Sequence, residues 1–264
     1  MIRALWTASS GMYAQQLNVD TIANNLSNVN TAGFKKNRVD FQELFYETLR
    51  PAANAGGEEQ AAPGNIYVGY GVRAAATAKL FSQGPLQPTD NPLDLAIEGD
   101  GFFQVTLGDG TVAYTRSGVF KLSGDGRIVT SDGYYLQYDG EGLPENATEI
   151  SIGEDGRITA TVEGEAEGQE MGQILLVRFV NPAGLEAMGR GLFRETQASG
   201  PAAEAAEPGT GGCGTIQQGV IEMSNVQIVE EMVNLIVAQR AYEINAKSIQ
   251  TSDELLSLAN NLRR

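Results

Sequence analysis

The chain has 264 residues, of which 42% are hydrophobic, so it can bury a core in one large or two ordinary domains. Its net charge of -15 argues against a nucleic-acid partner, because binding phosphates needs clustered lysine and arginine. The absence of histidine removes the commonest general base and the commonest zinc ligand, and the single cysteine, Cys213, excludes an intramolecular disulfide. The acidic excess lies in residues 51–220, so both ends are nearly neutral.

Residues 1–30 have the spacing of an amphipathic helix. Its inward positions recur with alternating gaps of three and four residues, a heptad pattern interrupted once by a glutamine. These positions are Leu5, Ala8, Met12, Gln15, Val19, Ile22 and Leu26. Gly11 weakens such a helix by about 1 kcal/mol relative to alanine. We therefore predict a helix that depends on a packing partner.

The helix should end in an unusual stretch, IANNLSNVNTAGFKK (residues 22–36). Asparagine competes with the backbone for hydrogen bonds, so four copies within seven residues need a physical reason. One interpretation is a helix end buried by neighbouring molecules, where the amides satisfy free carbonyls; the other is an ordinary exposed cap. Gly33 is predicted to adopt a positive φ and Phe34 to anchor the departing chain. Lys35 and Lys36 should favour the negative end of the helix dipole.

Short β-rich runs separated by turn signals fill the middle of the chain. Residues 101–142 carry Asp-Gly turns between apolar runs, which predict four or five strands in an antiparallel meander. Residues 149–164 repeat this device as a further hairpin. The most apolar run, QILLVRFV (residues 173–180), is the expected centre of the core. Residues 198–214, which contain Cys213, then predict a loop returning toward the C-terminal segment.

A long helix is predicted at the C-terminal end, because neither glycine nor proline follows Gly219. Three-four spacing is kept by Ile228, Met232, Leu235, Tyr242, Ala246, Ile249 and Leu256. Val229, Val233 and Ile236 widen the apolar surface beyond one seam. A helix of about 38 residues would be about 57 Å long. A stripe this wide favours several neighbours over one, although a long helix packed on its own domain is the alternative.

The sequence predicts no enzyme, no cofactor and no metal site. The pattern Gly69-x-Gly71-x-x-Ala74 superficially fits a dinucleotide fingerprint, but Pro85, Pro88 and Pro92 break the chain where the required helix and strand should be. The Asp-Gly pairs lack the alternating oxygen ligands and final glutamate of a calcium loop. We interpret all of them as turns. No stretch reaches the roughly 18 apolar residues of a membrane span, and no cleavable signal peptide follows Met1.

The asparagine-rich stretch resembles a signature of the axial proteins of the bacterial flagellum: a helix ending in Ala-Asn-Asn-Leu-x-Asn, then threonine and Gly-Phe-Lys. The far end, EMSNVQIVEEMVNLIVAQRAYEINAKSIQTSDELL (residues 222–256), resembles the C-terminal helix of the same family, with Ser224-Asn225-Val226 at its start. Within the family the likeness is greatest to distal rod subunits. It runs through residues 1–12, 99–130 and 191–200, and includes an insert at residues 50–68 that proximal rod subunits lack.

The resemblance implies an α+β fold, in which long N- and C-terminal helices form a coiled-coil-like core domain around an inserted, mainly antiparallel β domain. The expected division is a helix and motif in residues 1–45, a linker contacting neighbours in 46–72, an outer β-rich domain in 73–215 and a C-terminal helix in 216–264. The resemblance further implies a helical tubular homopolymer in the basal body, spanning the periplasm to the outer membrane. Its subunits would be exported without cleavage of a signal peptide and would act as a rigid drive shaft and export channel.

The implied partners are further copies of the chain, proximal rod proteins below, the hook protein above and the surrounding L and P ring proteins, with neither nucleic acid nor membrane insertion. A proximal rod or hook subunit is the alternative, and an enzyme acting on peptidoglycan is a remote one. The hypothetical assembly residues are Leu5, Met12, Val19, Ile22, Asn24, Asn25, Leu26, Asn28, Thr31, Gly33, Phe34, Asn225, Met232, Leu235, Gln239, Arg240, Tyr242, Ile249 and Leu256. The insert that would keep the shaft straight includes Arg50, Pro51, Glu58, Glu59, Pro63 and Val68.

Overall fold

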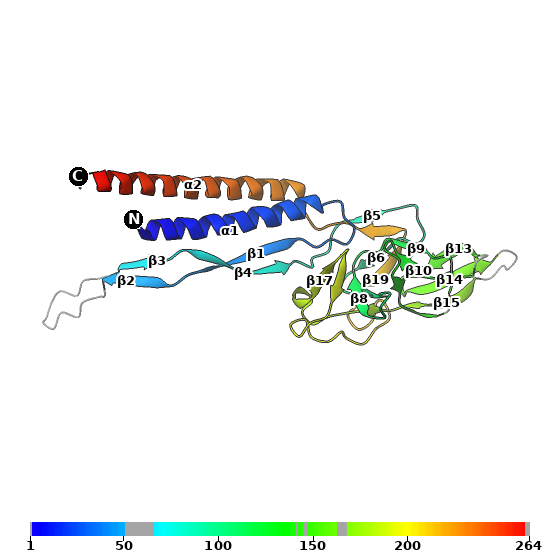
Figure 1. The fold of residues 1–264 in the computed structure, drawn as a ribbon. Helices are drawn as coiled ribbons and strands as arrows, with labels where there is room; N and C mark the ends of the chain where they lie inside the picture. Colours follow the sequence, from blue (N-terminus) through cyan, green and yellow to red (C-terminus); the bar gives the residue numbers. More distant parts are fainter. Residues whose placement is uncertain (1, 51–65, 141, 145–146, 163–167, 262–264) are drawn as a thin grey trace, which may run out of the picture. The chain divides into compact units, whose positions relative to one another are not determined.

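The computed structural model describes residues 2–50, 66–140, 142–144, 147–162 and 168–261, which form two compact units (Figure 1). We name the first the helical unit; it consists of Met1–Leu26, Asn37–Ala78 and Gln227–Arg264. We name the second the β unit; it consists of Ser27–Lys36 and Lys79–Val226. A helix near each end of the chain and many antiparallel strands between them confirm the predicted α+β class.

Two long helices dominate the helical unit, α1 (Ile2–Ser27) and α2 (Ile228–Asn261). They lie side by side, because a Cβ added at Gly11 of α1 would be 3.0 Å from the Asn245 amide of α2. The 34 residues of α2 correspond to about 51 Å. The predicted long C-terminal helix is confirmed, and residues 262–264 at its predicted end lie outside the described residues. A coiled-coil core stays a prediction.

A two-stranded antiparallel ribbon completes the helical unit. Its strands pair as β1 with β4 and, farther along, as β2 with β3. Their bounds are β1 (Asn37–Glu43), β2 (Tyr46–Arg50), β3 (Ile66–Gly69) and β4 (Val72–Lys79). Hydrogen bonds from Leu44 N to Gly71 O and from Tyr70 N to Phe45 O join the two pairs into one ribbon. The glycines of the false dinucleotide pattern therefore lie at this junction, where Gly71 has a φ of 108°.

The larger sheet of the β unit has the strand order β17-β18-β8-β7-β11-β10-β9, with β16 also paired to β7. Its strands are β7 (Phe102–Thr106), β8 (Val112–Thr115), β9 (Phe120–Leu122), β10 (Ile128–Thr130), β11 (Tyr135–Leu136), β16 (Leu176–Val177), β17 (Glu186–Gly189) and β18 (Leu192–Arg194). The predicted simple meander is wrong, because β8 does not pair with β9. Instead β11 pairs with β7, and the chain after β8 crosses to β9 at the opposite edge of the sheet.

The remaining strands form a four-stranded sheet, in the order β12-β15-β14-β13, and two separate pairs. The sheet consists of β12 (Tyr138–Gly140), β13 (Ala147–Ile152), β14 (Arg157–Val162) and β15 (Gln169–Ile174). The pairs are β5 (Leu86–Pro88) with β20 (Val220–Glu222) and β6 (Leu95–Glu98) with β19 (Thr215–Gln218). The hairpin predicted in residues 149–164 is confirmed as β13 and β14. A single-turn 3-10 helix, Pro182–Gly184, also lies in this unit.

The β unit contains two hydrophobic clusters. In the larger, Phe103 and Phe120 are fully buried and their ring centroids are 5.3 Å apart. In the smaller, Phe102 of β7 and Tyr114 of β8 meet the ring of Phe179 edge to face, and Phe193 of β18 meets Phe102 in the same way. The predicted central run, residues 173–180, supplies buried side chains to both clusters, but it is divided between the end of β15 and β16. In the part of the chain that the structure describes, no helix has the length and apolarity to cross a membrane.

Candidate assembly interface

The side chain of Asn25 joins three elements of the helical unit. It is 2% exposed, and its Nδ2 donates to Asn37 O at 2.9 Å while its Oδ1 accepts from Asn37 N at 2.9 Å. The same Nδ2 donates to Glu231 Oε2, in the first turn of α2, at 3.2 Å. This amide thus ties α1 to the start of β1 and to α2 within one chain. Its contacts differ from the predicted pairing with free carbonyls of the helix end.

The other asparagines of the stretch are less buried. Asn24 and Asn30 are exposed, whereas Asn28 is half-buried and its Oδ1 accepts a hydrogen bond from Thr31 Oγ1 at 3.3 Å. The backbone N–H of Thr31 donates to Asn28 O at 3.2 Å, which closes a turn directly after α1. These contacts are local, as in a helix cap, so the asparagines do not share one role.

Gly33 is confirmed in the predicted positive-φ conformation, with a φ of 70°. It is also held by close packing, since an added Cβ would lie 2.5 Å from Ser117 N. The next residue, Phe34, is half-buried, and the Lys79 ammonium lies 5.5 Å from the centre of its ring. Burial lowers the pKa of Lys79. Glycine is required at position 33 for two reasons: the turn needs a positive φ, and the backbone here packs closely against the loop that follows β8.

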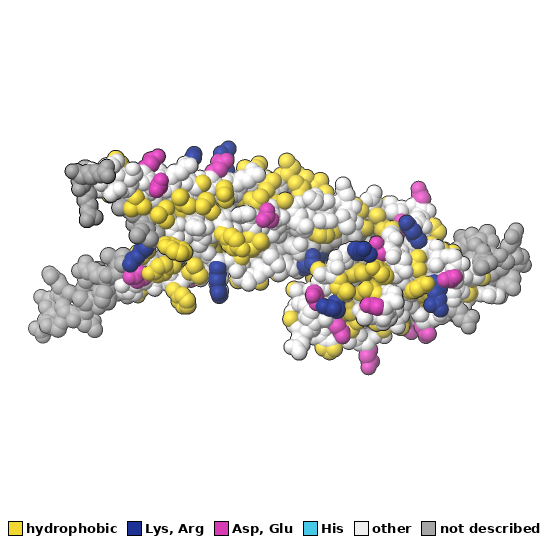
Figure 2. All heavy atoms as spheres, viewed as in Figure 1, with side chains coloured by type: hydrophobic (Ala, Val, Ile, Leu, Met, Phe, Trp, Pro, Cys, Tyr) yellow, Lys and Arg dark blue, Asp and Glu magenta, His cyan; other side chains and the backbone are white. Residues whose placement is uncertain are grey.

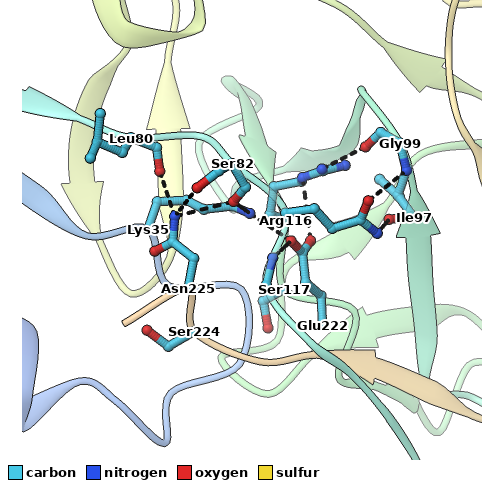
Figure 3. A network of polar contacts seen from close by, with 12 residues as sticks. Lys35, Leu80, Ser82, Ile97, Gly99, Arg116, Ser117, Glu222, Ser224 and Asn225 are labelled. Carbon is cyan, nitrogen blue, oxygen red and sulfur yellow. Dashed lines mark hydrogen bonds and ion pairs between the residues drawn. The ribbon is translucent and has the colours of Figure 1, made fainter. Parts of the chain in front are cut away.

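Lys35 does not face the helix end, so that prediction is wrong. Its side chain is fully buried in the β unit, where Nζ donates to Glu222 Oε1 at 2.6 Å and to Ser82 O at 2.8 Å (Figure 3). Arg116 is also buried, with Nε 3.4 Å from Glu222 Oε2. Burial lowers the pKa of Lys35, although the Glu222 carboxylate acts in the opposite direction.

Asn225 lies in the turn between β20 and α2, and not within the helix as the resemblance suggested. Its Oδ1 accepts from Lys36 N at 2.8 Å. Its Nδ2 donates to Leu80 O at 2.8 Å and to Ser82 O at 3.1 Å (Figure 3). All of these partners belong to the β unit. Asn225 therefore has an intramolecular role that its predicted place in an assembly surface did not include.

α2 differs from an ordinary amphipathic helix, because it exposes large apolar side chains while two of its three buried positions are polar. Its fully buried positions are Glu231, Ala238 and Ser252. By contrast, large apolar side chains are exposed along its length, and Figure 2 shows them in yellow. They are Ile228, Val229, Met232, Val233, Ile236, Val237, Ile244, Leu255 and Leu258. We name these nine residues the apolar face of α2. A face of this size on one helix is typical of an interaction surface.

Aromatic side chains extend the exposed apolar surface of the helical unit beyond α2. Trp6 and Tyr13 of α1 are each 69% exposed and lie seven residues apart, on the same side of the helix. On the ribbon, Phe45, Tyr46 and Tyr67 are exposed. The helical unit therefore carries exposed apolar side chains on both helices and on the ribbon.

The predicted seam residues of α1 face inward, whereas those of α2 are divided. Ile22 is buried, and the structure half-buries Leu5, Met12, Val19 and Leu26. On α2 the half-buried positions are Leu235, Ile249 and Leu256. The exposed positions are Met232, Gln239, Arg240 and Tyr242. Gln239 and Tyr242 line a hollow of about 400 Å³ with Gln16 and Val19 of α1, and Arg240 pairs with Glu243 at 2.7 Å.

Most of the insert expected to straighten the shaft lies outside the described residues, including Pro51, Glu58, Glu59 and Pro63. Its two ends are described. Arg50 is the last residue of β2, and Val68 lies in β3. In the register of this strand pair Arg50 is opposite Ile66, so the chain leaves and returns at adjacent points.

Sequence reasoning missed the charged side chains that hold the β unit together at this point. Lys35, Arg116 and Glu222 come from three distant parts of the chain, and none is part of a recognisable ligand motif. The available signal was an opposite charge in each terminal signature, namely lysine in GFKK and glutamate in EMSN. Within the described residues, no cluster of three acidic or cysteine side chains is arranged to hold a metal ion.

Comparison with family models places these features among the axial proteins of the flagellum. Three models match: "Flagella basal body rod protein" at residues 5–35, "Flagellar hook protein FlgE/F/G D1 domain" at 96–160 and "Flagellar basal body rod FlgEFG protein C-terminal" at 217–262. Hook and rod proteins share these models, so the models define a class of structural protein. Full-length relatives narrow this class.

The flagellar basal-body rod protein FlgG of Borreliella burgdorferi is 52% identical over 266 residues and covers 100% of both chains. The proteins of the same name from Caulobacter vibrioides and Bacillus subtilis are 46% and 42% identical, over 99% and 100% of this chain and the whole of theirs. The chain belongs to the flagellar basal-body rod protein family. It is a structural subunit of the flagellar rod, in the basal body.

Proposed function

We propose that the chain polymerises with copies of itself into the tubular shaft of the distal rod, which transmits torque and encloses a channel for exported proteins. Packing of the terminal helices of successive subunits would form the coiled-coil-like core of this shaft. The acidic β unit would provide its hydrated surface, since charged side chains are favoured in contact with water. Contacts that repeat without closing a ring propagate a helical filament of this kind.

The observation that carries the proposal is the apolar face of α2. Helices in single-chain proteins turn their apolar side chains inward. In α2 the inward positions include Glu231 and Ser252, while Val229 is 76% and Val237 62% exposed. Burying one such valine in a subunit contact contributes about 1.5–3 kcal/mol, and a face of nine residues can support a stable interface. A second copy of the chain is the proposed occupant.

A glutamate in place of Val237 is expected to prevent polymerisation. The buried, unpaired carboxylate would cost about 3–5 kcal/mol per contact and raise the concentration needed for assembly about 100-fold or more. Sedimentation velocity and electron microscopy of the purified chain measure this change. Because Val237 is largely exposed in the single chain, the helix content by circular dichroism should stay the same.

The matched control is Asn260→Asp, which adds a negative charge at an exposed position of α2 about 140° around the helix from Val237 and away from the apolar face. This variant should assemble near the normal concentration. Assembly of the Val237→Glu variant at that same concentration would contradict the role given to the apolar face of α2.

The insert is proposed to contact neighbouring subunits and keep the shaft straight. Because Arg50 and Ile66 are opposite each other, residues 51–65 can be replaced by an Asn-Gly turn without disturbing β2 and β3. We expect this variant to form curved or bendable polymers, since contacts that prevent sliding between subunits are lost. The curvature is measured by electron microscopy. Polymers as straight as those of the unaltered chain would refute the proposed role. The same outcome for a variant that lacks residues 50–68 would also refute it.

The proposed neighbours are proximal rod proteins below, the hook protein above and the L and P ring proteins around the shaft. The proposed location is from the periplasm to the outer membrane, reached by export without cleavage. Residues 1–45 and 216–264 would form the core, 46–72 would contact neighbours and 73–215 would face outward. Glu222 lies in β20, within the proposed core segment 216–264, but it belongs to the β unit. The boundary at residue 216 therefore follows the resemblance and not the division into compact units.

A hook subunit is the alternative from the same family. The flagellar hook protein FlgE of Helicobacter mustelae is 40% identical over 162 residues, which is 61% of this chain and 36% of that protein. The rod relatives cover the whole chain, and this favours the rod. Straight rather than curved tubes from the purified chain would distinguish the two. The proposed role is structural, and a turnover assay on peptidoglycan tests the remote enzymatic alternative.

A further inference from the structure

The segment that follows α1 is attached to the β unit chiefly by the residues just before α2. Gly33 N donates to Glu222 O at 2.8 Å, and Lys35 Nζ donates to Glu222 Oε1 at 2.6 Å. Lys36 N donates to Asn225 Oδ1 at 2.8 Å. Two backbone amides and one ammonium group of residues 33–36 thus depend on residues 222–225.

Further hydrogen bonds of this segment go to residues 80–82, a stretch that the side chain of Asn225 also contacts. Leu80 N donates to Lys36 O at 3.0 Å, and Lys35 Nζ donates to Ser82 O at 2.8 Å. Asn225 Nδ2 donates to the carbonyls of both Leu80 and Ser82, and Glu222 Oε1 accepts from Gly84 N at 2.9 Å. Residues 222–225 therefore link residues 33–36 to residues 80–84 (Figure 3).

Charge makes this arrangement depend on Glu222. Lys35 and Arg116 are both buried, and Glu222 is the carboxylate within ion-pair distance of each. Two cations cannot enter a dry site together unless an anion accompanies them, because an uncompensated buried charge is strongly destabilising. Lys35 can therefore be buried here only together with the strand β20, which carries Glu222 and pairs with β5.

We propose that Glu222 and Asn225 form a clasp, by which the segment after α1 docks on the β unit only when the C-terminal strand is in place. Gly33 and Lys35 lie at the end of the match to the rod-protein model, residues 5–35. Glu222 and Asn225 lie in the match to the C-terminal model, residues 217–262. The two signatures thus recognise each other inside one chain, before any contact with a second copy. Glu222 and Asn225 are positioning residues, and their role is independent of the apolar face of α2.

The test is the Glu222→Gln variant of the full-length chain, kept monomeric by low concentration and studied by amide hydrogen exchange. Glutamine keeps the size of the side chain but removes its charge. We expect exchange at Gly33 and Lys36 to accelerate about 10- to 100-fold, as for loss of a hydrogen bond to a charged group. Exchange at Phe103 and Val105, in the central strand β7, should change little. Unchanged exchange at Gly33 and Lys36, or equal acceleration everywhere, would overturn the clasp.

Glu186→Gln is the matched control. Glu186 Oε2 is also 2.6 Å from a cation, Arg194 Nη2, but both side chains are more than half exposed. This variant should leave the exchange of residues 33–36 unchanged, because water replaces the lost partner. An equal effect of both substitutions would mean that any lost ion pair loosens the segment, which also overturns the proposal.

Two further variants keep the test decisive if the Glu222→Gln chain does not fold. Asn225→Ala removes the acceptor of Lys36 N without changing any charge, and it should accelerate exchange at Lys36. Lys35→Met combined with Glu222→Gln removes the buried ammonium with the carboxylate and leaves Arg116 as the one buried cation of the three groups, so it should regain part of the stability lost in Glu222→Gln and slow the exchange at Gly33 relative to that variant. Local loss in the first and recovery in the second support the clasp; failure of either one contradicts it.

Discussion

Replacing Arg116 with alanine is expected to lower the free energy of unfolding of the β unit by about 3–5 kcal/mol, as for loss of one partner from a buried ion pair. Its guanidinium donates from Nη1 to Gly101 O at 2.9 Å and from Nη2 to Gly99 O at 2.6 Å. Its Nε is 3.4 Å from Glu222 Oε2, which has no hydrogen-bond partner among the described residues. Alanine would remove the donors of both carbonyls and the cation beside this buried carboxylate. Denaturant unfolding followed by near-ultraviolet circular dichroism measures the loss.

Arg194→Ala is the comparison for this substitution. Arg194 forms a shorter ion pair than Arg116, 2.6 Å from Glu186, but the pair is exposed and contributes at most about 1 kcal/mol. If both variants lost the same stability, burial would not explain the importance of Arg116. Trp6 lies in the helical unit, so its fluorescence should be unaffected by either substitution.

Gly33→Ala is expected to destabilise the chain by about 2–5 kcal/mol, the sum of backbone strain at positive φ and of overpacking. The added Cβ would lie 2.5 Å from Ser117 N and 2.7 Å from Arg116 C. Both atoms are backbone in the β unit, so neither can rotate away. Thermal unfolding and amide exchange in residues 33–36 measure the effect.

Two other glycines of the β unit separate the two causes. Gly200 has a φ of 76° but nothing within 4 Å of an added Cβ, so alanine there reports backbone strain alone. Gly108 has neither a positive φ nor a close neighbour, and alanine there should be nearly neutral or slightly stabilising. A loss at Gly33 no larger than that at Gly200 would show that the contact with Ser117 is not tight.

The helices and local hairpins could be predicted from the sequence because short-range patterns determine them. The three-four spacing from Leu5 to Leu26 gave α1, and the turn around Asp155 and Gly156 gave the hairpin of β13 and β14. The larger sheet could not be predicted, because its order depends on long-range pairs such as β11 with β7. Such pairs leave no signal in the spacing of nearby residues.

The start of α2 shows how a long-range pair overrides local composition. The run after Gly219 has no helix breaker, yet Val220–Glu222 forms β20 because it pairs with Leu86–Pro88. Two β-branched residues, Val220 and Ile221, suit this strand. The following turn is fixed by Asn225, whose amide contacts Leu80 and Ser82. The helix therefore begins only at Ile228.

The site was predicted in part, for a related reason. The positive φ of Gly33 followed from its place after a helix, which is a local property. The burial of Lys35 depends on Glu222, which is 187 residues away in the sequence. Exposure of Val229, Val233 and Ile236 agreed with a stripe too wide for one intramolecular partner. The assembly residues themselves stay predictions until a polymer is studied.

The pairing of β6 with β19 has a consequence for how the family can change in length. Leu95–Glu98 and Thr215–Gln218 lie in register, and Gly214 N donates to Asp100 O at 2.7 Å, so residues 99–214 begin and end beside each other. A segment with adjoining ends can be enlarged or exchanged as a cassette, while the strands that frame it keep their register. A different module can therefore be inserted between β6 and β19 without redesign of either terminal helix.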